Sequence, residues 1–392
     1  MEHRLTPFQW YHETQRSSGD SSPLEPGAAS LRDRFLLGLG TFTDEGLNTA
    51  LSHRVDVFIA SAACYPVLFP DRVNVSREVT LSAYDRLSTA LTVAQVTGVQ
   101  SLCSHYAARL APLDSPDASR ESNIRLAQIT QYARQLASQP TLICSKALQQ
   151  LSEVGLSTQD IVTFSQIIGF VSYQARVVAG IAALAGRPAV VLPGFPQTED
   201  AEPAGFSGAV RSWQARLPEI RVEQAQARQL DILDQSHPDA RSDSYYLLLA
   251  HDAPALHERN AVFNSIEHHA DGLSPRLKAL VALVASRING CHYGFALAAN
   301  KMADQKLTQA LVVGTDAARE IADDPQTAAV IGVTAELART PEKFTAQSVP
   351  TLFNSGLDRL QALDVILTGA LHAWENRLRY SLGNTLDCNN QI

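Results

Sequence analysis

Two adjacent residues in the last third of the chain have the types and the setting for nucleophilic chemistry. Cys291 and His292 directly follow Asn289 and Gly290, a pair that is poor helix interior and good turn chemistry. We therefore predict a helix, a break and a second helix. A cysteine just after such a break lies where backbone N–H groups are unpaired and the helix dipole is positive. This setting should lower the thiol pKa and favour the nucleophilic thiolate.

Four more polar side chains are candidates for the same pocket. Glu267 and His268 precede the helix that leads to Cys291, while His372 and Glu375 lie on one face of the last helix. Acid, base and nucleophile types together could serve proton transfer, lactone opening, elimination or decarboxylation. Each candidate also has a purely structural interpretation. Glu267 and His268 would lie in a solvated loop, and His372 and Glu375 would be a hydrogen-bonded interface pair. Cys291 would be a small buried hydrophobic residue.

The cysteine and histidine spacings do not favour a metal or a local redox pair. The five cysteines stand at positions 64, 103, 144, 291 and 388, and no two of them form a Cys-x-x-Cys pair. An odd number of cysteines in a reducing compartment indicates free thiols. His372 and Glu375 alone would supply only two ligands, so no metal site is predicted and no cofactor is expected.

Composition limits the class of protein. The 392 residues suffice for roughly two or three domains, and 45% hydrophobic with 18% charged residues indicates a globular chain. A net charge of −8 argues against nucleic acid or an anionic membrane as the main partner. The partner that we expect is a small-molecule substrate. No uninterrupted apolar run reaches the ~18 residues that span a bilayer. The polar start gives no secretory signal, so we expect a cytoplasmic protein.

Helical periodicity dominates the sequence. It covers, among others, residues 83–96, 124–138, 161–185, 245–264, 274–286 and 357–382. Ser157, followed by the acidic Asp160, has the pattern of a helix start. Because no alternating run lies between hairpin turns, we predict an all-α fold.

Composition also divides the chain. Residues 1–30 are polar and rich in Ser, Pro and Gly, and we expect a mobile N-terminal arm. Residues 186–211 are dense in Pro and Gly and lack periodicity, as in a linker. The predicted domains are therefore 31–185 and 212–385.

The two predicted domains share an internal repeat. Residues 81–107 align without gaps with 273–299, which places Gly98 opposite Gly290. Further along, the matched pairs are Pro140 with Pro341, Gly155 with Gly356 and Arg176 with Arg377. A tandem duplication is the natural interpretation, with the copies packed on each other or on other chains of an oligomer.

The segment Asn289-Gly-Cys-His-Tyr293, after an Ala/Leu/Val helix, resembles the signature of the alkyl hydroperoxidase D-like superfamily, which includes carboxymuconolactone decarboxylase. Residues 244–252 with Arg259 and Phe263 resemble its peroxidase-related branch, and residues 155–176 resemble a later helix of the same family. This resemblance implies two all-helical domains, a nominal peroxidase-related oxidoreductase, and a homo-oligomer, a dimer or trimer of two-domain chains.

The family's site contains a Glu, a Cys-x-x-Cys and a His four residues after the second Cys. Only Cys291 matches it in the second half, where the other three positions are Gly294, Ala298 and Ala279. The first-half positions are Val99, Leu102, Tyr106 and Leu87. A lone cysteine cannot close the local disulfide on which the redox cycle depends.

Three functions therefore stay open. The first is a diverged family member with a repurposed, non-redox small-molecule pocket in the second half, using Cys291, His268, His372 and Glu375. The second is a thiol-dependent hydroperoxide reductase, in which Cys291 works with an outside thiol or with Cys388. The third is a non-catalytic binding or structural subunit, whose two sites are filled by apolar side chains.

Overall fold

A computed structural model describes residues 33–188, 199–209, 212–339 and 341–384. The predicted arm over 1–30, parts of the predicted linker over 186–211, and Cys388 lie outside the described residues. Within them the predicted all-α class is confirmed. The strand content there is a single antiparallel pair of two-residue segments, β1 (Gln214–Ala215) and β2 (Gly383–Asn384).

The helices form two series along the chain. The first contains η2 (Leu39–Phe42), α2 (Glu45–His53), α3 (Val55–Leu68), α4 (Ala83–Thr97), α5 (Gln100–Leu110), α6 (Arg120–Ser138), η3 (Pro140–Leu142), α7 (Ser145–Glu153) and α8 (Thr158–Leu184). The second contains η4 (Val222–Gln224), α9 (Ala227–Ser236), α10 (Ser244–Leu249), η5 (Ala250–Asp252), α11 (Ala253–Glu267), α12 (Pro275–Asn289), α13 (His292–Ala299), α14 (Gln305–Val313), α15 (Thr315–Glu320), α16 (Pro325–Arg339), η6 (Pro341–Lys343), α17 (Pro350–Asn354) and α18 (Arg359–Leu382).

Both predicted helix breaks are present. Gly98 ends α4 at φ +69° and Gly290 ends α12 at φ +78°, a left-handed conformation that glycine adopts without strain. Ser157 and Asp160 form a capping box at the start of α8, as the sequence predicts. The helix predicted over 245–264 is instead divided into α10, η5 and α11, because the Asp252 carboxylate caps α11 through the Ala255 N–H.

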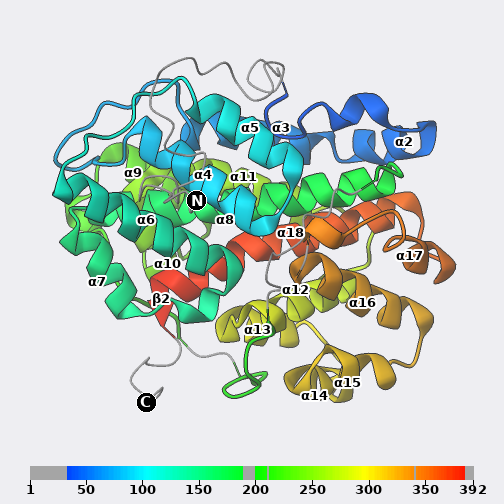
Figure 1. The fold of residues 1–392 in the computed structure, drawn as a ribbon. Helices are drawn as coiled ribbons and strands as arrows, with labels where there is room; N and C mark the ends of the chain where they lie inside the picture. Colours follow the sequence, from blue (N-terminus) through cyan, green and yellow to red (C-terminus); the bar gives the residue numbers. More distant parts are fainter. Residues whose placement is uncertain (1–32, 189–198, 210–211, 340, 385–392) are drawn as a thin grey trace, which may run out of the picture.

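The two long helices α8 and α18 lie side by side through the middle of the molecule (Figure 1). Gly169 of α8 permits this approach, since a Cβ there would lie 2.1 Å from the ring of Trp374. The Tyr173 and Trp374 rings pack 5.8 Å apart, and Trp374 Nε1 donates to Gln166 at 3.0 Å. By length and composition α8 could cross a membrane, but 94% of its most apolar window is buried inside this fold, as in the core helix of many globular proteins.

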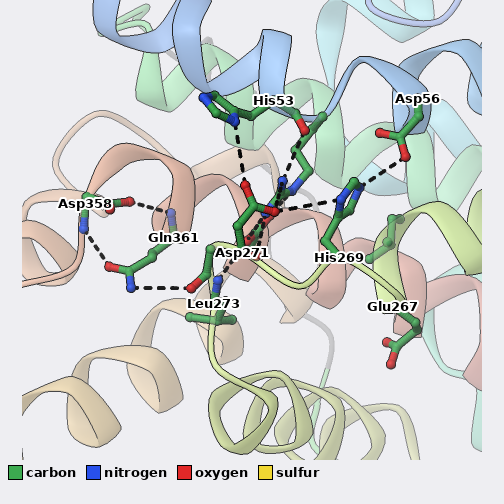
Figure 2. A network of polar contacts seen from close by, with 12 residues as sticks. His53, Asp56, Glu267, His269, Asp271, Leu273, Asp358 and Gln361 are labelled. Atoms are coloured by element: carbon green, nitrogen blue, oxygen red, sulfur yellow. Dashed lines mark hydrogen bonds and ion pairs between the residues drawn. The ribbon is translucent and has the colours of Figure 1, made fainter.

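Helices near the start of each series pack against the long helix of the other series. Helix α2 lies on α18, η5 lies on α8, and α3 lies along α11 (Figure 1). At the first of these contacts Arg54 makes a two-fold ion pair with Asp364, at 2.7 and 2.8 Å, and also binds Asp271. Figure 2 shows this network around Asp271. At the second contact Thr163 donates to Asp252.

Candidate functional site

Cys291 occupies the position that the sequence indicates, at the start of a helix. It is the N-cap residue of α13, and its sulfur accepts a hydrogen bond from the Gly294 N–H at 3.3 Å. Helix α12 ends at Asn289, and Gly290 turns the chain directly before Cys291. The side chain is 1% exposed, so the thiol lies under other atoms rather than at a surface.

The expected lowering of the Cys291 pKa is wrong. Burial raises the pKa of the thiol to about 11, and this effect outweighs the Gly294 N–H and the positive charge of Arg379, which act in the opposite direction. The sequence shows where a helix begins, but it does not show how deeply its first residue is covered. At neutral pH the sulfur is therefore a thiol and a weak nucleophile.

The space beside the sulfur is filled by polar packing. A Cβ added at Gly294 would lie 2.6 Å from Asn376 Oδ1 and 2.9 Å from Ser286 Oγ, as well as 3.2 Å from the Cys291 sulfur. Ser286 donates to Asn376 at 3.0 Å, so these two side chains hold each other in place. Within the described residues Cys291 is a free cysteine.

A buried ion cluster adjoins Cys291 and contains Glu375. This carboxylate accepts from Arg259 Nε at 2.7 Å and lies 3.4 Å from Arg379 Nε, and the hydroxyl of Tyr245 is 3.4 Å away. Burial alone would raise the pKa of Glu375, but the two guanidinium groups lower it overall. Glu375 is thus a charged counter-ion, which leaves it poorly suited to take up a proton as a general base.

The second arginine of this cluster is stacked between two aromatic rings. Arg379 Cζ lies 4.1 Å from the centre of the Tyr245 ring and 5.0 Å from that of Tyr293. The Arg379 side chain is 15% exposed, and Tyr293 is half-buried, so the outer side of the cluster reaches solvent. Two arginines share one carboxylate here, which leaves one positive charge without a balancing negative charge in the cluster.

Glu267, the last residue of α11, forms a second pair with His372, which lies about one turn before Glu375 on α18. His372 Nε2 lies 3.8 Å from Glu267 Oε1, and Lys301 Nζ lies 3.9 Å from the same carboxyl group. Burial raises the pKa of Glu267, but the hydrogen bond and charge of His372, with those of Lys301 and Lys278, bring it down to about 2. The pair joins a carboxylate to an imidazole, which is the arrangement that proton relays use.

The two remaining predicted site residues lie elsewhere. His268 is the exposed C-cap residue of α11. His292 Nε2 lies 3.1 Å from the Ala204 carbonyl, and its ring packs 4.4 Å from that of Phe206. Figure 2 shows Glu267 apart from the neighbouring network of His269 and Asp271. The six predicted residues are therefore found in two neighbouring pairs, Cys291 with Glu375 and Glu267 with His372, and two separate histidines.

Sequence reasoning missed the arginine and tyrosine that complete the cluster. Arg379 stands four residues after Glu375 on the same helix, a spacing that favours an ion pair and could have indicated it. Tyr245 comes from α10, and its place over α18 depends on tertiary packing that no local pattern contains. Among the described residues, no group of three or more His, Cys, Asp or Glu side chains is placed to hold a metal ion.

Comparison with known proteins adds no assignment, since no family model matches this chain and no curated protein matches it. The fold and the site together define an all-α protein in which a buried thiol lies next to an arginine–glutamate–tyrosine cluster.

Proposed function

We propose that this protein is a diverged relative of the alkyl hydroperoxidase D-like superfamily, built from two copies of one helical unit. In this proposal the second copy binds and acts on a small carboxylate without thiol redox chemistry. The cluster of Arg259, Glu375 and Arg379 beside Cys291 is the observation that carries it.

The order of elements supports the duplication. Helices α4, α5, α6, η3, α7 and α8 are followed, in the same order, by α12, α13, α16, η6, α17 and α18, with α14 and α15 inserted before α16. Helix α4 packs on α5 and on α8, and α12 packs in the same way on α13 and on α18. The residues aligned in the sequence, such as Gly98 with Gly290, occupy the same places in this order.

Reciprocal contacts between the two series support it further. Arg176 donates to the Ala338 carbonyl, and Arg377 donates to the Ala137 carbonyl, each at 2.6 Å. Both pairs of residues are aligned in the repeat. A two-fold relation between copies produces such exchanged pairs, whereas unrelated halves would not be expected to share them.

The charge of the second-half cluster supports a carboxylate ligand. Buried or partly buried cations are stable when they are paired, and Arg379 has to share Glu375 with Arg259. A guanidinium group suits a carboxylate particularly well, because its planar N–H groups match the two oxygens. Arg379 would orient the ligand beside Cys291, and His372 of the same helix, held by Glu267 of α11, would move a proton.

Thiol-dependent hydroperoxide reduction receives less support. It needs an available thiolate, and burial raises the pKa of Cys291 to about 11. It also needs a second sulfur, and the volume next to Cys291 is occupied by the Ser286–Asn376 pair. If hydroperoxide consumption in the presence of dithiols is the same for wild type and Cys291→Ser, this alternative is excluded.

Ligand binding tests the proposal directly. Wild-type protein is titrated with benzoate, succinate and their uncharged amides, and binding is followed by calorimetry. We expect a carboxylate to bind and its amide to bind at least about tenfold more weakly, since a charge-assisted hydrogen bond contributes roughly 1.5–3 kcal/mol. Arg379→Met should abolish this preference and Arg379→Lys should keep part of it.

Arg241→Met is the matched control, because Arg241 forms an exposed ion pair with Asp234 and makes no ion pair with Glu375 among the described residues. The proposal fails if acids and amides bind equally, or if Arg379→Met binds the acid as wild type does.

A further inference from the structure

The first series of helices borders a cavity that is separate from the cluster around Cys291. Its volume is ≈ 370 Å³, which is near the lower end of the range for small-ligand sites. The start of α5, the last turns of α8, and η6 form its walls. It therefore lies at the helix break of the first half, where Gly98 and Val99 join α4 to α5.

One wall of this cavity carries a buried carboxyl group. Glu342 of η6 is 8% exposed, and its Cβ would lie 2.7 Å from a Cβ added at Gly98. Within the described part of the chain no basic side chain forms an ion pair with it. Burial raises the pKa of Glu342, and a hydrogen bond from its own backbone N–H and the charges of Lys343 and Arg176 offset this only in part. A cation bound in the cavity would therefore stabilise the charged form of this largely buried carboxyl group.

A helix N-terminus borders the same cavity. Helix α5 begins at Gln100, and its N-cap residue, Val99, has no side chain that could cap it. The first backbone N–H groups of a helix have no intrahelical acceptor, and they attract anions. Gln100, Ser101 and Ser104 all line the cavity and add further hydrogen-bonding groups.

The remaining wall is mostly apolar. It consists of Val178, Ala179 and Ala182 from α8, together with Leu39 and Phe344, and Arg187 adds one basic side chain at its edge. A ligand that satisfies all three walls has an anionic group, a cationic group close to it, and a compact apolar body.

The matching break in the second half shows what such a surface accepts. There the chain covers it: Ala201 lies over Gly290, and Phe206 packs on His292 and Phe295. In the first half the aligned positions are Gln100 and Cys103, and the described residues there border the cavity instead.

We propose that this cavity binds a free α-amino acid with an apolar side chain. Its ammonium group pairs with Glu342, its carboxylate accepts from the first N–H groups of α5, and its side chain packs against Val178 and Phe344. The site is independent of the carboxylate site proposed beside Arg379.

Three related probes separate the contributions: L-phenylalanine, phenethylamine, which lacks the carboxylate, and 3-phenylpropanoate, which lacks the ammonium group. Binding to the full chain is measured by calorimetry. It is located by hydrogen exchange of the α5 segment 99–104, so that an acid bound beside Arg379 is not counted. We expect L-phenylalanine to protect this segment, and each incomplete probe to bind it at least about tenfold more weakly.

Two variants test the assignment. Glu342→Gln should weaken L-phenylalanine binding at least about tenfold, while Glu320→Gln, at an exposed position, should leave it unchanged. Ala182→Phe should fill the cavity and remove binding with an unchanged circular dichroism spectrum. The proposal is overturned if wild type shows no binding, if phenethylamine binds as well as the amino acid, or if neither variant weakens binding.

Discussion

Arg377 Nη2 of α18 donates a hydrogen bond of 2.6 Å to the carbonyl oxygen of Ala137, in the last turn of α6. The last carbonyl groups of a helix have no intrahelical donor, and this end of the helix dipole favours a cation. Arg377 thus completes a helix that belongs to the other series. Arg176 has the same relation to Ala338, in the last turn of α16.

This relationship predicts a large stability effect at a position far from any proposed chemistry. Arg377→Met should reduce the free energy of unfolding by about 1.5–3 kcal/mol, since it removes a charge-assisted bond and leaves the Ala137 carbonyl without its donor. Denaturant unfolding measures the change. Arg241→Met, in an exposed ion pair, should stay within about 0.5 kcal/mol of wild type. Equal losses in the two variants would contradict the assigned role.

Two glycines that follow helices, Gly290 after α12 and Gly186 after α8, predict different costs for an added methyl group. Gly290→Ala combines a positive φ with a Cβ only 2.2 Å from Thr141 Cγ2, while Gly186 has a positive φ and open space around it. We expect Gly186→Ala to cost roughly 1–2 kcal/mol from backbone strain alone. Gly290→Ala should cost a further 1–3 kcal/mol, roughly, from overpacking. Thermal unfolding of both variants checks the difference, and similar melting temperatures would argue against tight packing at Gly290.

The fold was largely predictable because its signals are local. Apolar spacing indicates α4, α12 and α18, and Gly98 and Gly290 mark the breaks between helices. Short helices such as α14 and α15 were missed, since each provides only two turns or so of periodicity. The site was less predictable, because Cys291 owes its raised pKa to burial and Glu375 owes its charge to an arginine on α11. Both properties arise from residues distant in the sequence.

A cysteine at position 294, where the proposed family would have its second cysteine, is predicted to destabilise the protein. Gly294→Ala should cost about 1–3 kcal/mol, since its Cβ enters the space held by Ser286 and Asn376. Gly294→Cys should cost at least as much. Unfolding free energies test this, and Ser286→Ala should relieve part of the cost when it is combined with Gly294→Cys. A fully stable Gly294→Cys variant would show that the volume is free.

The Glu267–His372 pair predicts an acid-sensitive contribution to stability. The folded-state pKa of Glu267 is about 2, below its ordinary value of 4.5, so the unfolded chain binds the proton more readily. The stabilisation is therefore complete above about pH 4.5 and is lost as the pH falls towards 2, with a size on the order of 2 kcal/mol.

Glu267→Gln should flatten the stability profile between about pH 4.5 and 2, and should change it little in shape above that window. Glu320→Gln, at an exposed position, is the control. Parallel profiles for wild type and Glu267→Gln below pH 4.5 would mean that the pair does not hold the carboxylate in its charged form.

The exchange of helices between the two series has a consequence for how the chain can be divided. Helix α2 packs on α18 and η5 packs on α8. A protease cut between Pro188 and Glu199 would therefore break the backbone, but the two fragments would stay associated. Each fragment would hold helices whose buried surface is supplied by the other. A nicked protein should therefore migrate as one species on gel filtration until denaturant separates the pieces.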